Sequence, residues 1–166
     1  MIVSSKGDGS LVFYPGFRKE ENWVRDCGID FSDKEQVLQW FKENYNGWNE
    51  IWLDLFENAT TPFIPRQQYC MPFDQTWEAL PNLTMLGDAA HLMPPYAGEG
   101  VNMAMLDALE LSQHLLNNNF ENTHDAIASY ENQMRARASE IAKMSMDSTA
   151  ALHAENAIDF MKSVIS

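Results

Sequence analysis

Positive charge and long hydrophobic runs are scarce in this sequence, and each scarcity excludes a class of protein. Only 11 lysines and arginines stand against 24 aspartates and glutamates, which gives a formal net charge of −13. Nucleic acids and anionic membrane surfaces attract positively charged proteins, so we expect no nucleic-acid partner and no membrane partner. No apolar stretch approaches the roughly 20 residues of a membrane span, and the N-terminus lacks a secretion signal. A cytoplasmic protein is therefore expected.

Cysteine is also scarce. Cys27 and Cys70 lie far apart in the chain and have no metal-ligand spacing, so we expect two free thiols and no metal site. Apolar residues, in contrast, make up 45% of the chain, and 11% of all residues are aromatic. This composition is typical of a folded protein, and 166 residues suffice for a sizeable core.

The N-terminal residues predict a β-hairpin. A Gly-rich turn at residues 6–9 separates two short runs with strand character, residues 1–5 and 10–14. A domain that opens in mid-hairpin leaves a sheet edge that needs a partner. We therefore expect a fragment of a longer protein, and one that could form a homodimer through this edge.

Apolar residues recur at helical spacing after the hairpin. Ser32 is a plausible N-cap for the first helix, with Glu35 at the capping-box position. A second helix is expected over residues 48–56, and the prolines of segment 61–73 indicate an edge strand or a bent strand. A Met- and Ala-rich helix is expected from about residue 123 to beyond residue 143, followed by a separate amphipathic helix.

The centre of the chain predicts a strand followed by a helix. Residues 83–86 form a short apolar run between Pro81 and Gly87, which is the pattern of a strand buried on both faces. The next helix is expected over residues 100–116. Its apolar positions share one face: Val101, Met105, Ala108, Leu109, Ser112 and Leu116.

Gly87 and Asp88 follow this expected strand directly. Because Gly87 has no Cβ, it lets a ligand chain approach the backbone at the sharp turn. Asp88 projects from the carboxyl end of the strand, where open α/β sheets bind ligands, and its carboxylate can accept hydrogen bonds from sugar or ribityl hydroxyls. On these two residues alone, a carboxylate that caps the following turn is the simpler interpretation.

The residues that follow extend the pattern. Pro94 and Pro95 stiffen the loop, while Gly98 and Gly100 leave backbone N–H groups open to a ligand. A helix that starts near Gly100 presents unsatisfied N–H groups, equivalent to about +0.5 charge, at its first turn. The N1–C2=O edge of an isoalloxazine ring would suit this position, and so would a phosphate.

This segment resembles the second flavin-binding motif of FAD-dependent aromatic-ring monooxygenases, the p-hydroxybenzoate hydroxylase group. The family pattern is Gly-Asp-Ala-Ala-His, then Pro, Gly-x-Gly, Asn and finally Asp-Ala. The matching positions are Gly87, Asp88, Ala89, Ala90, His91, Pro95, Gly98, Gly100, Asn102, Asp107 and Ala108. Within the family, the segment looks most like the tetracycline-inactivating enzymes, which also have His-Leu-Met-Pro-Pro before an aromatic residue.

The resemblance implies an enzyme with FAD as its cofactor and NADPH or NADH as the reductant. Such enzymes hydroxylate an aromatic or polycyclic small molecule through a flavin C4a-hydroperoxide. The flavin carries the chemistry, so no catalytic side chain is predicted, and His91 and Asp107 are interpreted as structural. The tetracycline-binding branch carries a His in the strand that here reads Leu11-Val12-Phe13, which argues against tetracycline as the substrate.

The resemblance also implies the roles of single residues. Asp88, positioned by Gly87, would bind the ribityl chain. The residues that would line the isoalloxazine are Pro95, Gly98, Gly100, Val101 and Asn102. Tyr96 would face the flavin and the substrate, and Phe13 is the second residue expected on the substrate side.

The implied fold is a mixed α+β fragment of the α/β class. It would be a partial FAD/NAD(P)-binding fold with part of the antiparallel substrate-domain sheet and long C-terminal helices. Residues 1–78 would be the C-terminal part of a substrate-binding domain. Residues 79–119 would be the second FAD-binding motif, as strand, loop and helix, and residues 120–166 a C-terminal helical segment.

One family feature is absent. The family binds the pyrophosphate of FAD with Gly-x-Gly-x-x-Gly after a first strand, but neither Gly-x-Gly pair, at residues 7–9 and 98–100, has the third glycine. Three interpretations stay open: the C-terminal portion of a monooxygenase whose N-terminal Rossmann half is missing, one half of a split flavoenzyme, or a non-catalytic binding module. The isolated chain is expected to bind FAD weakly or not at all and to lack hydroxylase activity.

Overall fold

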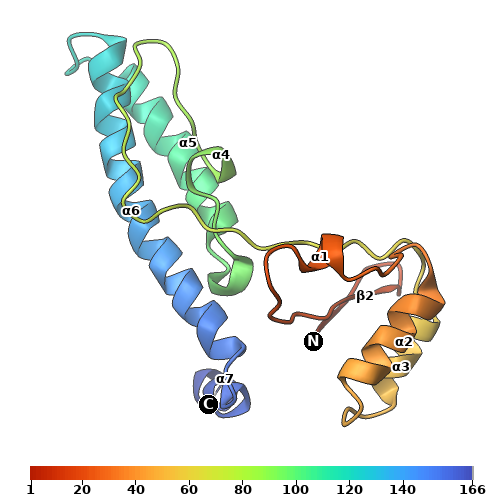
Figure 1. Ribbon diagram of the computed structural model, residues 1–166. Helices are drawn as coiled ribbons and strands as arrows, with labels where there is room; N and C mark the ends of the chain where they lie inside the picture. Colours follow the sequence, from red (N-terminus) through yellow and green to blue (C-terminus); the bar gives the residue numbers. More distant parts are fainter. Residues whose placement is uncertain (166) are drawn as a thin grey trace. The chain divides into compact units, whose positions relative to one another are not determined.

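The computed structural model describes residues 1–165 and divides into two compact units, with the boundary between Gln67 and Gln68. It combines helices with a small antiparallel sheet (Figure 1). The expected mixed α+β class is therefore confirmed. Ser166, the last residue of the expected C-terminal helical segment, lies outside the described residues.

The first unit is a β-hairpin followed by helices. β1 (Ile2–Ser5) pairs with β2 (Leu11–Tyr14) in an antiparallel ladder in which Ile2 lies opposite Tyr14. The expected hairpin is therefore confirmed. The helices of this unit are α1 (Trp23–Asp26), α2 (Lys34–Asn44) and α3 (Ile51–Glu57).

The N-cap of α2 is Asp33, so the expectation of Ser32 was wrong. Asp33 Oδ1 accepts hydrogen bonds from the N–H groups of Glu35 at 3.0 Å and Gln36 at 3.3 Å. The Ser32 hydroxyl donates to Asp30 instead, at 2.6 Å. Serine side chains bond readily to groups two residues away, and here that local turn captures the hydroxyl before it can cap the helix.

Aromatic rings form the core of the first unit. Phe41 of α2 and Phe56 of α3 stack with their ring centroids 4.3 Å apart, and both side chains are buried. Phe13 of β2 meets Phe56 edge-on at 5.0 Å. The hairpin and the two helices therefore share one apolar cluster.

Two expected strands are absent from the residues that the structure describes. Segment 61–73 is irregular, since its prolines remove the backbone donors that a ladder needs. Residues 83–86 are irregular as well: one isolated bridge joins Leu80 to Leu83, and Leu83 is 61% exposed. A strand buried on both faces needs a neighbour at each edge, and the described sheet contains β1 and β2 alone.

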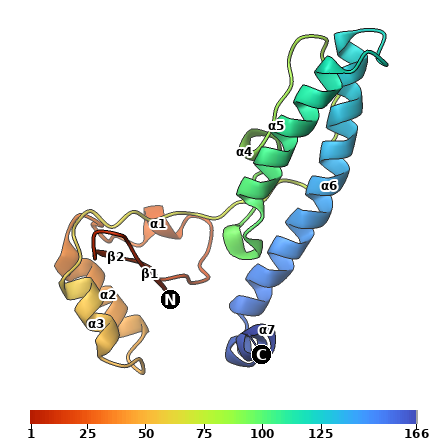
Figure 2. The same cartoon turned by 180° about the vertical axis from the view of Figure 1, so that it is seen from behind.

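The second unit is helical (Figure 2). Its elements are α4 (Asp88–His91), the 3₁₀ turn η1 (Pro95–Ala97), α5 (Gly100–Leu116), α6 (Thr123–Leu152) and α7 (Ala157–Ile165). α5 and α6 lie side by side in both views (Figures 1 and 2) and are joined by a short connection, so they run antiparallel. The helices expected at 100–116, after residue 123 and after residue 157 are confirmed.

Three methionines from separate segments pack on two alanines of α6. Met71, Met93 and Met103 form one buried cluster with Ala138 and Ala142, both of which are fully buried. The small side chains leave room for flexible methionines, which fill irregular gaps well. This cluster packs the start of α5 and the segment before it against α6.

α5 turns its apolar residues outward. The apolar stripe, as we call Val101, Met105, Ala108, Leu109, Ser112 and Leu116, is exposed throughout: Val101 is 72% exposed, Met105 68% and Leu116 82%. The buried residues of α5 are Met103 and Asp107. The face of α5 that meets α6 therefore carries a carboxylate, and the face marked by the apolar pattern has no partner among the described residues.

Cys27 and Cys70 are free thiols, as expected. Burial raises the pKa of the Cys70 thiol, which lowers its reactivity as a thiolate. Within residues 1–165, no helix has both the length and the apolar composition needed to cross a membrane.

Candidate functional site

The motif loop, residues 87–99, connects the irregular segment before it to α5. It contains α4 and η1. Hydrogen bonds hold it at both ends of α4 and at Pro94. Its carbonyl groups accept hydrogen bonds from three places: Ala90 from Gln75 Nε2 at 2.7 Å, Leu92 from the Met71 N–H at 2.8 Å, and Pro94 from the Ser145 hydroxyl. The loop is therefore fixed by contacts to its backbone between Ala90 and Pro94.

Gly87 makes the sharpest turn of the loop, with φ +59° and ψ −143°. This is a conformation that is essentially restricted to glycine. A Cβ built on Gly87 would lie 3.1 Å from Cβ of Ala104 in α5. Backbone conformation and close packing therefore both require glycine at this position.

Asp107 of α5 binds the motif loop through its carboxylate. Its Oδ2 accepts hydrogen bonds from the Gly87 N–H at 2.9 Å and from His91 Nε2 at 2.5 Å. Its Oδ1 accepts one from Arg137 Nη2 at 2.9 Å, and Arg137 Nη1 also pairs with Glu110 at 2.7 Å. Asp107 and His91 are both fully buried, so this network lies in the interior of the second unit.

Most of the predicted cofactor residues lie in the motif loop and the first turn of α5. Gly87 is buried, whereas Asp88 at the start of α4 is exposed. The others lie along the rest of the loop and the first turn of α5, where they are exposed or half-buried: Pro95, Gly98, Gly100, Val101 and Asn102. Phe13, predicted on the substrate side, lies in the other unit, with its ring in the aromatic core.

The first turn of α5 is the electropositive part of this region. No side chain caps the helix, and the N–H groups of Gly100, Val101 and Asn102 have no partner within it because of helix geometry. A Cβ at Gly98 or Gly100 would meet no atom within 4 Å. The backbone is therefore open to a planar or anionic group here, and the Asn102 amide lies beside it, held by Glu99 at 3.2 Å.

Tyr96 lies on η1, next to these open amides. Its ring packs edge-on against His153 with centroids 5.3 Å apart. Burial raises the pKa of Tyr96, so its hydroxyl stays protonated at neutral pH. It can serve as a hydrogen-bond donor at the edge of the site.

Two further side chains of α6 hold the segment that leads into Gly87. The Tyr130 hydroxyl donates to the Met85 carbonyl at 3.2 Å, and burial, reinforced by the charge of Asp107, raises the pKa of Tyr130. The buried Glu131 accepts hydrogen bonds from Trp77 at 2.7 Å and Thr84 at 2.8 Å. These side-chain bonds hold the segment that includes residues 83–86, where the sequence predicted a strand.

The sequence did not reveal Arg137 or Glu110 as parts of this region. A signal existed: Asp107 interrupts an apolar helix, and Arg137 lies within a helix rich in Met and Ala. Buried carboxylates require a partner, but nothing in the sequence says which cation of α6 reaches Asp107. Register between the two helices decides this.

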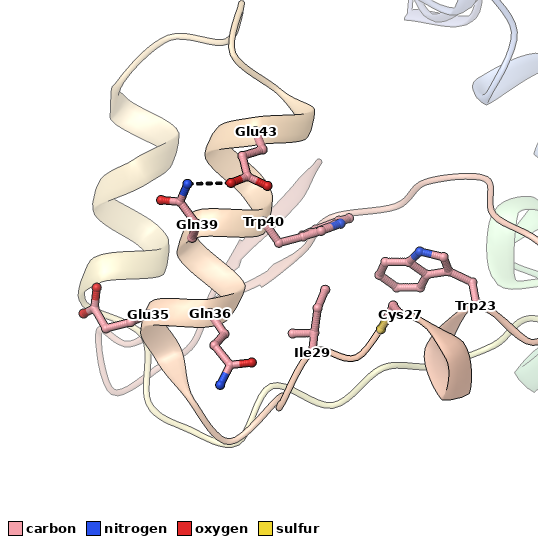
Figure 3. A pocket seen from close by; sticks show the side chains of 8 residues that line it. All are labelled: Trp23, Cys27, Ile29, Glu35, Gln36, Gln39, Trp40 and Glu43. Atoms are coloured by element: carbon pink, nitrogen blue, oxygen red, sulfur yellow. Dashed lines mark hydrogen bonds between the residues drawn. The ribbon is translucent and has the colours of Figure 1, made fainter.

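The first unit has an open pocket of its own (Figure 3). The indoles of Trp23 and Trp40 turn toward one another with ring centroids 5.3 Å apart. The lining residues are Trp23, Cys27, Ile29, Glu35, Gln36, Gln39, Trp40 and Glu43. Trp40 of α2 therefore lines a pocket, while Phe56 of α3 is buried in the core. No cluster of His, Cys, Asp or Glu within residues 1–165 could hold a metal ion.

The motif loop and the start of α5 thus expose the Asp88 carboxylate, an uncapped helix N-terminus and the backbone at Gly98 and Gly100. Residues 76–145, which include the whole motif loop, α5 and most of α6, match the family described as FAD binding domain. This part of the chain is therefore similar to an FAD binding domain.

Individual relatives carry more specific names. Phenazine 1,6-dicarboxylic acid hydroxylase PhzS of Lysobacter antibioticus is 32% identical over 133 residues, which cover 78% of this chain and 29% of that protein. FAD-dependent monooxygenase ntnJ of a Nectria species is 28% identical over 135 residues, 81% of this chain and 30% of that protein. Kynurenine 3-monooxygenase of Stenotrophomonas maltophilia is 31% identical over 71 residues, 43% of this chain and 15% of that protein. The chain spans less than a third of the length of these curated relatives.

Proposed function

We propose that this chain is the C-terminal portion of an FAD-dependent, NAD(P)H-using monooxygenase that hydroxylates an aromatic or polycyclic small molecule. The observation that supports this proposal is that two findings coincide. The FAD binding domain match covers residues 76–145, and the exposed carboxylate, the open glycine backbone and the uncapped helix start all lie inside that range.

The chemistry of these groups fits a flavin. The Asp88 carboxylate is an acceptor for the hydroxyls of the ribityl chain. The first-turn N–H groups of α5 suit the N1–C2=O edge of the isoalloxazine, because a helix N-terminus stabilises negative charge there. Pro95, Gly98 and Asn102 would line the ring, and Tyr96 would offer its hydroxyl to flavin or substrate. When bound, reduced flavin supplies the activation of molecular oxygen, with NADPH or NADH as its reductant.

The proposed substrate class rests on what two of the relatives act on. Two of them act on a phenazine dicarboxylic acid and on kynurenine, which are aromatic molecules. The resemblance to tetracycline-inactivating enzymes rests chiefly on the His-Leu-Met-Pro-Pro segment at residues 91–95.

The missing partner in this proposal is an N-terminal dinucleotide-binding half, in the same protein or on a second chain. It would cover the apolar stripe of α5 and place a strand beside residues 83–86, which lie just before Gly87. Leu83, Met85 and Leu86 are 61%, 40% and 40% exposed, so both features present apolar surface. Burial of apolar surface at roughly 25 cal/mol per Å² would stabilise such a contact.

The direct test is the complete flavoprotein. We expect purified protein to contain FAD, to oxidise NADPH or NADH faster when an aromatic substrate is present, and to insert one oxygen atom into that substrate, measured by mass spectrometry with ¹⁸O₂. A complete protein that neither contains nor binds FAD would contradict the proposal and favour a non-catalytic binding module.

Replacing Asp88 by alanine in the complete flavoprotein should raise the dissociation constant of FAD by about 10- to 100-fold, the equivalent of one or two hydrogen bonds to a charged acceptor. The measurement is titration of the apoprotein by quenching of flavin fluorescence. Asp74→Ala, which removes another exposed carboxylate of the same unit, is the matched control and should leave the constant unchanged. Equal constants for Asp88→Ala and the wild type would contradict the assigned contact.

A charged side chain at the centre of the apolar stripe tests whether the N-terminal half covers it. In the 166-residue chain, Met105→Glu should change the free energy of unfolding by less than about 0.5 kcal/mol, because Met105 is 68% exposed. In the complete flavoprotein the same change should cost about 3 kcal/mol or more, because it would bury an unpaired charge. Gln113→Glu, on the same helix but off the stripe, should have a small effect in both. A small effect of Met105→Glu in the complete protein would mean that the N-terminal half docks elsewhere.

A further inference from the structure

Asp107 is a fully buried carboxylate that is bonded from three separate elements. The Gly87 N–H comes from the turn before α4, His91 from the end of α4, and Arg137 from the middle of α6. Asp107 itself belongs to α5. One side chain therefore links every element of the second unit that borders the motif loop's first turn.

Both carboxylate oxygens of Asp107 act as acceptors. The Gly87 N–H and the Arg137 guanidinium can only donate, so the carboxylate accepts from both. His91 Nε2 lies 2.5 Å from the same oxygen as the Gly87 N–H, whereas His91 Nδ1 is buried without a hydrogen-bond partner. His91 therefore joins the network through Nε2 alone.

The network lies next to the residues that are predicted to bind the flavin. Gly87 immediately precedes Asp88, and its turn is already constrained by its positive φ and its contact with Ala104. The bond from Asp107 ties that turn to α5, the same helix whose first-turn N–H groups are open. The Asp88 carboxylate and the helix N-terminus are thereby held at a fixed separation.

We propose that Asp107, held by Arg137, is a positioning residue for the flavin. It sets the distance between the carboxylate that would hold the ribityl chain and the N–H groups that would hold the isoalloxazine, without touching the cofactor. The inference rests on the proposed function, because it concerns the same site.

Stability alone gives little reason for this network. A buried ion pair stabilises a fold no better than well-packed apolar residues of similar volume. A carboxylate with three donors in fixed directions, however, specifies geometry in a way that apolar contacts do not. The second unit also offers an internal comparison: Glu131 is a second buried carboxylate, and it bonds Trp77, Thr84 and Arg135 rather than Gly87.

The first test uses the 166-residue chain and requires no cofactor. Asp107→Asn keeps the side-chain volume but turns an NH₂ group toward one of three donors, so at least one hydrogen bond must break. We expect the exchange protection of the Gly87 amide, measured by hydrogen–deuterium exchange, to fall at least tenfold. Glu131→Gln should leave Gly87 protection within threefold of the wild type. Unchanged Gly87 protection in Asp107→Asn would overturn the inference.

The second test uses the complete flavoprotein, at a temperature where thermal unfolding shows each variant to be folded. Asp107→Asn should raise the dissociation constant of FAD at least tenfold and shift the visible absorption bands of the bound flavin. Glu131→Gln should change the constant by less than threefold, even if it lowers the melting temperature as much. Equal weakening by both variants would show a structural effect only and overturn the inference, while the proposed function would stand. A wild-type protein that binds no FAD would overturn both.

Discussion

Replacing Gly87 by alanine is expected to lower the free energy of unfolding of the second unit by about 2–4 kcal/mol. Two costs add. The backbone of Gly87, at φ +59° and ψ −143°, is in a region that residues other than glycine adopt only with strain. The new methyl group would also press on Cβ of Ala104 at 3.1 Å, and the helical backbone of α5 limits how far Ala104 can move.

Gly98→Ala is the comparison for Gly87→Ala. Gly98 also has a positive φ, +72°, but a Cβ there would meet nothing within 4 Å. Its replacement should cost only the backbone term, about 1–2 kcal/mol. The measurement is the free energy of opening from native-state hydrogen exchange of the most protected amides in α5 and α6. If Gly98→Ala and Gly87→Ala were equally destabilising, neither the more restricted backbone of Gly87 nor its close packing against Ala104 would add to the cost.

Arg137→Met should destabilise the second unit by about 3–5 kcal/mol, because removing one partner of a buried ion pair leaves an uncompensated charge. Asp107 is fully buried and would keep its hydrogen bonds from Gly87 and His91 but lose its cation. Glu110, which shares Arg137, would lose its partner as well. The methionine fills a similar volume, so packing loss contributes little.

Arg25→Met is the matched comparison. Arg25 pairs with Asp26 at 2.7 Å, but the two side chains are 71% and 57% exposed. Solvent screens such a pair, and its loss should change stability by less than about 1 kcal/mol. Urea unfolding of the two variants, followed by hydrogen exchange in each unit, provides the measurement. A loss below about 1 kcal/mol for Arg137→Met would mean that Asp107 does not depend on this cation for its charge.

Local elements followed closely from the sequence. The hairpin at residues 1–14 is specified by a glycine-rich turn between two short strands, and both are present. The helix predicted over residues 100–116 is α5, Gly100–Leu116, since helical spacing and the preceding glycines act within a few residues. The cap of α2 was misplaced by one residue because Asp30 competed for the Ser32 hydroxyl.

Long-range pairing did not follow. Residues 83–86 have the composition of an interior strand, yet a strand forms only beside another one, and the described residues supply no neighbour. The same limit applies to α5: its periodicity marks the apolar stripe correctly, but periodicity does not say which partner covers it. α6 instead packs on the face that carries Met103 and Asp107.

The sequence by itself determined the chemistry available in the segment from Gly87 to Asn102: a carboxylate after a glycine, stiffened prolines, open glycines and a helix start. Those features are local, because they depend on side-chain type and spacing. Only the tertiary structure decided how they are held. Arg137 lies 30 residues from Asp107 along the chain, and their contact depends on how α5 packs against α6. That packing, together with the turn at Gly87, fixes the predicted site in place.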